Sequence, residues 1–160
     1  MVDESGTRSL AELLDLDAID LDARADDKEA AVRACGETLV RVGAVQPAYV
    51  DAMLERERTI STYVGEGVAI PHGTLAAKEA VVRDALCYLR FAEPIDWDGD
   101  EVTVCVGIGI AARDNGHIAI LGQLATILMD PPRAAALRAA TSADDVIALF
   151  TPDPEEAEEV

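Results

Sequence analysis

The chain has 160 residues, which is enough for one compact domain and too few for two ordinary ones. Half of the residues are hydrophobic and only 4% are aromatic, so we expect a folded, mainly aliphatic core rather than wholesale disorder. Aspartate and glutamate number 31 against 13 lysines and arginines, and the formal net charge is −18. This charge argues against nucleic acid and against an anionic membrane surface as direct ligands.

The basic residues are almost all arginine, with Lys28 and Lys78 the only lysines. Arginine in place of lysine is typical of a GC-rich genome. An acidic chain with few lysines also fits an organism with high internal salt, where charge repulsion is screened. The sequence leaves both explanations open.

The three cysteines, Cys35, Cys87 and Cys105, are far apart and lie in apolar surroundings. There is no CxxC pair, and the two histidines do not complete a zinc-binding spacing, so we expect buried free thiols in a reducing cytoplasm and no metal. The acidic start is unlike a secretion signal, and no apolar run approaches the roughly 20 residues that span a bilayer. There is no P-loop either, so no nucleotide or other cofactor is expected.

Elements of the first third can be predicted from periodicity. Residues 1–8 are expected to form a flexible tail, and leucines at 10–14 indicate a short helical turn. Apolar and acidic residues alternate over 18–25, which predicts a strand with one solvent-exposed face. Two helices follow, over 26–42 and 47–58, because apolar residues recur at helical spacing in both. Glycine ends the first helix and proline begins the second.

The middle of the chain changes to strand-like composition. β-Branched residues and glycines predict a strand with a turn or bulge over 59–70, ended by Pro71, and one or two helical turns over 75–80. Strands are predicted over 85–91 and 102–110, with a loop containing Glu93 and Pro94 between them. Alternate glycines in the second of these strands would let another element pack closely.

Helices dominate the last part. They are predicted over 117–128, 134–140 and 142–150, the last with a capping-box-like start, and residues 152–160 form an acidic tail that we expect to be disordered. The pattern predicts a single α/β domain over 9–151, with a small mixed β-sheet flanked by helices on both faces.

His72 lies in the run Ile-Pro-His-Gly, after the glycine-bearing strand. The proline fixes the backbone before it, and the glycine after it leaves the imidazole open to an approaching macromolecule. A loop histidine without a task is the alternative interpretation.

His117 falls in the first turn of a predicted helix, on its inward-facing stripe. One interpretation is a partly buried, hydrogen-bonded histidine. The other uses its position, because a helix N-terminus attracts anions and its field favours the neutral, nucleophilic imidazole.

Arg56 and Arg58 precede the strand that leads to His72, and arginine binds phosphate oxygens in a bidentate manner. Arg56 could instead complement the C-terminal dipole of its own helix or pair with a carboxylate. Glu66 could steer a proton or face a partner, although a solvated turn carboxylate is equally consistent.

Taken together, two motifs identify a family. The run Tyr-x-Gly-Glu-x-x-Ala-x-Pro-His-Gly-Thr spans 63–74, and Ala-Ala-Arg-x-Asn-x-His spans 111–117. With Arg56 16 residues before His72 and His117 45 residues after it, the chain resembles the enzyme IIA domain of the mannitol/fructose class of the sugar phosphotransferase system. It is more similar to the mannitol branch than to the fructose or nitrogen-regulatory branches.

The resemblance implies a mechanism and partners. The family's active-site histidine, matching His72, accepts a phosphoryl group at Nε2 from the phosphohistidine carrier HPr. It then passes the group to a cysteine of enzyme IIB, while the membrane permease IIC imports the sugar. His117 matches a supporting histidine, and Arg56 matches an arginine that stabilises the phosphoryl group.

No cysteine of this chain lies in a phosphate-binding loop, so IIB and IIC are expected to be separate polypeptides. The implied function is that of a cytoplasmic phosphotransferase component, without direct membrane insertion. The alternative is a regulatory IIA-like module whose phosphorylation state controls a transporter or a transcription regulator.

Overall fold

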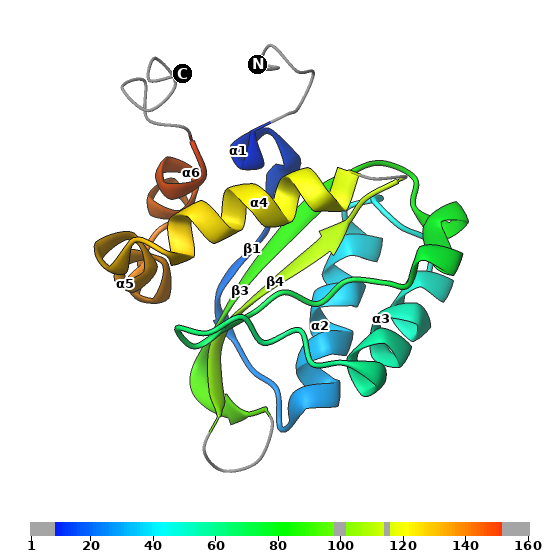
Figure 1. Cartoon of the computed structure of the whole chain (residues 1–160), viewed down its shortest axis with the longest axis horizontal. Helices are drawn as coiled ribbons and strands as arrows, with labels where there is room; N and C mark the ends of the chain where they lie inside the picture. Colours follow the sequence, from blue (N-terminus) through cyan, green and yellow to red (C-terminus); the bar gives the residue numbers. More distant parts are fainter. Residues whose placement is uncertain (1–8, 98–101, 114–115, 152–160) are drawn as a thin grey trace.

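The computed structural model describes residues 9–97, 102–113 and 116–151, so the predicted tails over 1–8 and 152–160 lie outside the described residues. The described part of the chain forms one sheet with helices packed around it (Figure 1). The helices and strands are α1 (Leu10–Leu13), β1 (Leu14–Ala23), α2 (Lys28–Arg41), α3 (Ala48–Thr59), β2 (Val68–Ala69), the 3-10 helix η1 (Leu75–Ala80), β3 (Ala85–Asp96), β4 (Thr103–Ala111), α4 (Gly116–Leu128), α5 (Pro131–Ala139) and α6 (Ala143–Phe150).

The four strands form one mixed sheet in the order β1-β3-β4-β2. The central strands β3 and β4 are antiparallel, and each edge strand runs parallel to its neighbour. The predicted α/β class with a small mixed sheet is therefore confirmed.

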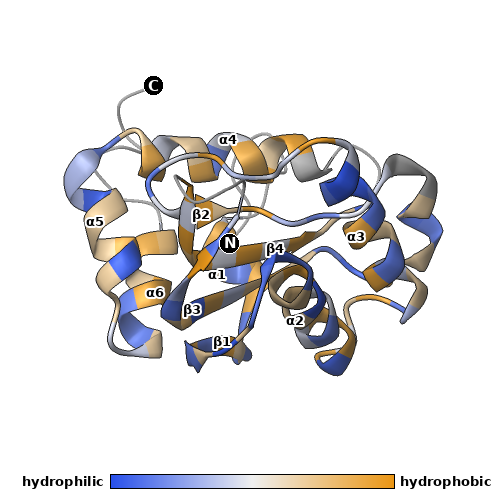
Figure 2. Cartoon of the chain, turned by 90° about the horizontal axis from the view of Figure 1, so that it is seen from below, coloured by the Kyte–Doolittle hydropathy of each residue, from blue (hydrophilic) through white to orange (hydrophobic). Residues whose placement is uncertain are grey.

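Helices cover both faces of the sheet, as predicted. On one face, a Cβ added at Gly109 of β4 would lie 3.1 Å from the Cβ of Cys35 in α2, so the glycine permits the close packing expected from the sequence. On the other face, the buried Tyr88 of β3 donates a hydrogen bond to the Leu137 carbonyl of α5 and meets the ring of Phe150 in α6 edge-on. Figures 1 and 2 show α2 and α3 on one side of the strands, with α5 and α6 on the other.

The helix boundaries follow the signals in the sequence. The Asp27 carboxylate caps α2 by accepting from the Ala30 amide at 2.8 Å, and Gly43 follows the helix with a φ of +78°. Pro47 precedes α3, and the Ser142 hydroxyl caps α6 by accepting from the Asp145 amide at 3.1 Å. These predictions are confirmed to within a few residues.

The predicted strand over 59–70 is wrong in its extent. Thr59 still belongs to α3, and only Val68–Ala69 forms β2. Gly65, Glu66 and Gly67 all have positive φ values, so they form a tight turn that interrupts any long strand. The segment before the turn pairs with β2 through a short bridge between Tyr63 and Ala69, where the Val64 amide also donates to the Val68 carbonyl at 3.0 Å.

Three other boundaries differ from the predictions. β1 runs over Leu14–Ala23, so it begins four residues before the strand predicted over 18–25. Glu93 and Pro94 were expected in a loop, but they lie within β3, where a shift in the pairing register between Arg90 and Ile95 accommodates the proline without a ladder hydrogen bond. α5 begins at Pro131 rather than at residue 134, because a proline is well tolerated in the first turn of a helix.

The core is aliphatic, as expected, and gathers on the two faces of β3 and β4. All three cysteines are free thiols; Cys35 and Cys87 are buried, whereas Cys105 is partly exposed. Within the described ranges, no helix has the length and apolarity needed to cross a bilayer.

Candidate functional site

His72 lies where the chain leaves β2 and continues beside the end of β4. The Pro71 carbonyl accepts from the Ile110 amide at 2.9 Å, and His72 itself forms an isolated parallel bridge with Ile110. The backbone of this loop is therefore aligned by the edge of the sheet. The histidine is half-buried at the carboxyl end of β4.

The imidazole of His72 is oriented by its own loop. Its Nδ1 lies 2.8 Å from the carbonyl oxygen of Ile70. A carbonyl oxygen can only accept, so Nδ1 must donate and must carry the ring proton. In the neutral ring, Nε2 is then unprotonated and holds the lone pair that a nucleophile needs.

Tyr49, in the first turn of α3, joins the backbone after His72 to the residue of β4 that pairs with His72. Its hydroxyl accepts from the Gly73 amide at 2.9 Å and donates to the Ile110 carbonyl at 2.9 Å. A Cβ added at Gly73 would lie 2.5 Å from Cε1 of the tyrosine, so the ring occupies the space of a side chain there. Burial raises the pKa of Tyr49, although the bond from Gly73 opposes this, so the hydroxyl keeps the proton that it donates.

Glu57, two turns further along α3, holds the segment that pairs with the histidine loop. The residue is only 4% exposed, and its carboxylate accepts from the Thr62 amide at 2.8 Å, from the Thr62 hydroxyl and from Trp97 Nε1 at 3.2 Å. The Thr62 carbonyl in turn accepts from the Ile70 amide at 2.9 Å. Hydrogen bonds thus connect Glu57 to the residue whose carbonyl orients His72.

Sequence reasoning missed both Tyr49 and Glu57. Glu57 belongs to the run Glu-Arg-Glu-Arg, which is typical of a solvated helix end, and Tyr49 fits the apolar stripe of α3. The one available signal was spacing, because Tyr49 stands seven residues before Arg56 and thus shares a helix face with it.

His117 is the second residue of α4, which begins shortly after β4 ends at Ala111. The fold therefore brings both histidine positions to the same end of β4, where the positive end of the α4 dipole also lies. Asp114 and Asn115, which precede this helix, and the ring of His117 lie outside the described part of the chain, so the role of this histidine stays a prediction.

The arginines and Glu66 make other contacts. Arg56 Nη1 donates to the Ile60 carbonyl at 2.8 Å, an arrangement that caps the end of α3. Arg58 pairs with Glu29 at 3.4 Å, and both side chains are exposed. Glu66 pairs with Arg138 of α5 at 3.0 Å. A role of Arg56 at the phosphoryl group therefore also stays a prediction.

Comparison with known proteins identifies the family. Residues 12–152 match the family described as "Phosphoenolpyruvate-dependent sugar phosphotransferase system, EIIA 2". The chain is 43% identical to the mannitol-specific phosphotransferase enzyme IIA component of Halalkalibacterium halodurans, over 86% of this chain and 94% of that protein. It is also 43% identical to the mannitol-specific EIICBA component of Klebsiella pneumoniae, of whose length it spans 22%.

A solved structure agrees with these sequence matches. It is the complex of enzyme IIA for mannitol with phosphorylated enzyme IIB from Escherichia coli, and the likeness has a TM-score of 0.79 with 38% identity. The alignment covers 86% of this chain and 98% of that one. The extent of the family match, the identity to full-length relatives and the shared fold lead to one conclusion: the chain belongs to the type-2 enzyme IIA family of the sugar phosphotransferase system.

Proposed function

We propose that this protein is the IIA component of a mannitol phosphotransferase system. In this role it accepts a phosphoryl group from HPr on His72 Nε2 and delivers it to a cysteine of enzyme IIB. The observation that carries the proposal is the hydrogen bond from His72 Nδ1 to the Ile70 carbonyl, because it leaves Nε2 as the unprotonated nitrogen.

The two transfer steps follow from this tautomer. The Nε2 lone pair attacks the phosphorus of phospho-HPr in line, a new N–P bond forms, and the N–P bond to the donor imidazole breaks. The positive charge that develops on the His72 ring is stabilised at Nδ1–H by the Ile70 carbonyl. In the second step a IIB thiolate attacks the phosphorus, and the bonding electrons return to Nε2.

Arg56 and His117 are assigned supporting roles in these steps. A guanidinium matches the geometry of phosphoryl oxygens, and the first turn of α4 offers backbone amides and the positive end of a dipole. To reach the phosphoryl group, Arg56 would exchange its bond with the Ile60 carbonyl for one with the phosphoryl oxygens.

The relatives favour sugar uptake over the regulatory alternative. The 43%-identical proteins are named as mannitol-specific components, and the solved complex pairs enzyme IIA with phosphorylated enzyme IIB. On that basis we propose that this chain also acts in mannitol uptake and transfers its phosphoryl group to enzyme IIB. HPr is the proposed donor, and the permease IIC is an indirect partner. The proposal places the reaction in the cytoplasm, where free thiols such as those of this chain persist.

Phosphorylation with purified enzyme I and HPr tests the proposal. We expect one labelled residue, His72, by mass mapping, and no labelling of His72→Ala. His117→Ala and Arg56→Ala should still accept phosphate but transfer it to IIB about 100-fold more slowly, the size of a lost electrostatic contact in a transition state. Normal labelling of His72→Ala would overturn the assignment, and unchanged transfer by the other two variants would remove their supporting roles.

A further inference from the structure

We propose that Tyr49 is a positioning residue for phosphoryl transfer: its hydroxyl holds His72 in the orientation and tautomer that leave Nε2 unprotonated. The inference rests on the proposed function, because it assigns a role in the same reaction. Tyr49 lies outside the two histidine motifs and is distinct from the supporting arginine, Arg56.

The hydroxyl of Tyr49 joins the histidine loop to β4. It accepts from the amide of Gly73, which follows His72, and it donates to the carbonyl of Ile110, the residue paired with His72 across the sheet edge. The loop and β4 are thus both bonded to the same oxygen atom. Since the ring is only 4% exposed, water is poorly placed to replace either bond.

The ring of Tyr49 also packs against the histidine loop. The ring lies so close to Gly73 that no side chain fits there, and it prevents the loop from moving toward α3. Pro71 restricts the backbone on the other side of His72. The loop is therefore held from both ends, and Nδ1 stays 2.8 Å from the Ile70 carbonyl.

The consequence for chemistry concerns the ring proton. Removing the hydroxyl leaves the Gly73 amide and the Ile110 carbonyl without their partner, so the loop gains freedom to shift. Once the Ile70 carbonyl no longer faces Nδ1, the proton also populates Nε2, and a ring protonated there cannot attack phosphorus. Loss of alignment slows an in-line transfer further.

Tyr49→Phe tests this inference, with Tyr88→Phe as the matched control. Both tyrosines are buried and donate to a backbone carbonyl, but Tyr88 bonds Leu137 of α5 on the opposite face of the sheet. We expect Tyr49→Phe to lower the maximal rate of phosphoryl acceptance about tenfold with an unchanged KM for phospho-HPr. Nitrogen-15 spectra of the His72 ring should show mixed tautomers in this variant only.

The outcomes separate the inference from the proposed function. If the unaltered protein is not labelled at His72, the proposed function fails. The nitrogen-15 spectra then still test whether Tyr49 restrains the His72 ring. If it is labelled but Tyr49→Phe matches Tyr88→Phe in rate and tautomer, the inference is overturned. Should Tyr49→Phe not fold, amide exchange in the unaltered protein decides: protection at Gly73 supports the bond to the hydroxyl, and free exchange there overturns it.

Discussion

β1 and β2 are the two edges of the sheet and both run parallel to their neighbour, yet ten residues form β1 and two form β2. β1 is bonded along β3, and Arg41 donates to the Asp17 carbonyl of β1 at 2.7 Å. The β2 segment, which continues to His72, pairs with β4 over only two residues and is also bonded by side chains of α3.

This difference between the two edges indicates where substitutions should most affect stability and activity. Beyond its pairing with β3, the side-chain contacts of the long acidic edge are exposed, so each of them contributes little. The short edge is held by buried hydrogen bonds from Tyr49 and Glu57, and each of these leaves unsatisfied partners when it is removed. We therefore expect changes near β2 to exceed those near β1, both in stability and in activity.

Glu57→Ala should give the largest loss of stability. It would leave the Thr62 amide, the Thr62 hydroxyl and Trp97 Nε1 without an acceptor in a buried place. We expect the free energy of unfolding to fall by about 3 kcal/mol, measured by urea denaturation. Glu55→Ala, at an exposed position of the same helix, is the control and should stay within about 0.5 kcal/mol of the unaltered protein. Equal losses for the two variants would contradict the special role given to Glu57.

Gly73→Ala should have the next largest effect. The new Cβ would meet Cε1 of Tyr49 at 2.5 Å, so the loop or the ring must move, and we expect about 2 kcal/mol of destabilisation with slower labelling of His72. Gly122→Ala provides a control of opposite sign, because that glycine lies exposed in α4 with open space around it. It should stabilise the protein by about 0.5 kcal/mol in thermal unfolding. A tolerated alanine at residue 73 would mean that the tyrosine ring does not restrain this loop.

The helices could be predicted because their signals are local. Asp27 caps α2 through a residue three positions away, and Ser142 does the same for α6. The segment over 59–70 could be predicted only in part. Its glycines correctly indicated the turn at Glu66, but β-branched composition favoured a longer strand, and the hydrogen bond from Thr62 to Glu57 left no signal in the sequence.

The functional site, too, could be predicted only in part. His72 could be found from its motif, since proline and glycine flank it in a recognisable run. The hydrogen bonds of Tyr49 that restrain this ring could not be predicted. A tyrosine at helical spacing is typical of a core residue, and its partners Gly73 and Ile110 are 24 and 61 positions away. Long-range hydrogen bonds leave no periodic trace in a sequence.

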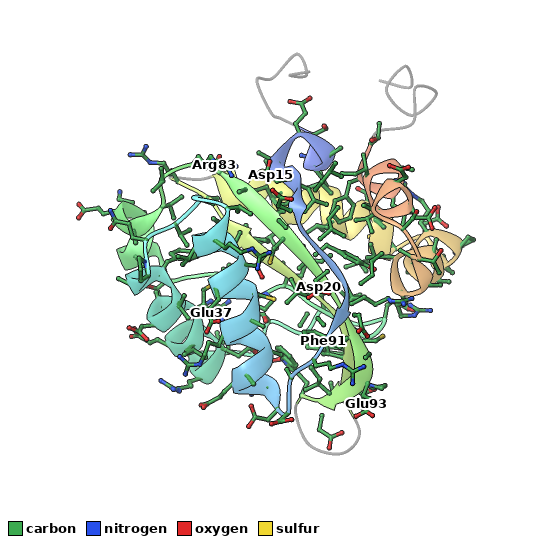
Figure 3. The ribbon with its side chains drawn as sticks, turned by 180° about the vertical axis from the view of Figure 1, so that it is seen from behind. Asp15, Asp20, Glu37, Arg83, Phe91 and Glu93 are labelled. Carbon is green, nitrogen blue, oxygen red and sulfur yellow. The ribbon has the colours of Figure 1, made fainter. Side chains whose placement is uncertain are left out.

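The smallest effect is expected at the acidic edge, for the pair between Arg83 and Asp15 of β1 (Figure 3). The two atoms are 2.8 Å apart, but the side chains are 40% and 49% exposed, so we expect a coupling free energy below about 1 kcal/mol. A double-mutant cycle with Arg83→Ala and Asp15→Ala measures it, and the coupling should shrink further in about 1 M salt, where the screening length is about 3 Å.

Asp15→Ala alone sharpens the contrast between the edges. The formal charge of the chain is −18, so removing one carboxylate relieves repulsion and offsets the lost ion pair. The variant should therefore stay within about 0.5 kcal/mol of the unaltered protein in low salt. Exposed ion pairs rarely exceed about 1 kcal/mol. A salt-independent coupling free energy above about 2 kcal/mol between Arg83 and Asp15 would therefore mean that β1 is as sensitive to substitution as the β2 segment.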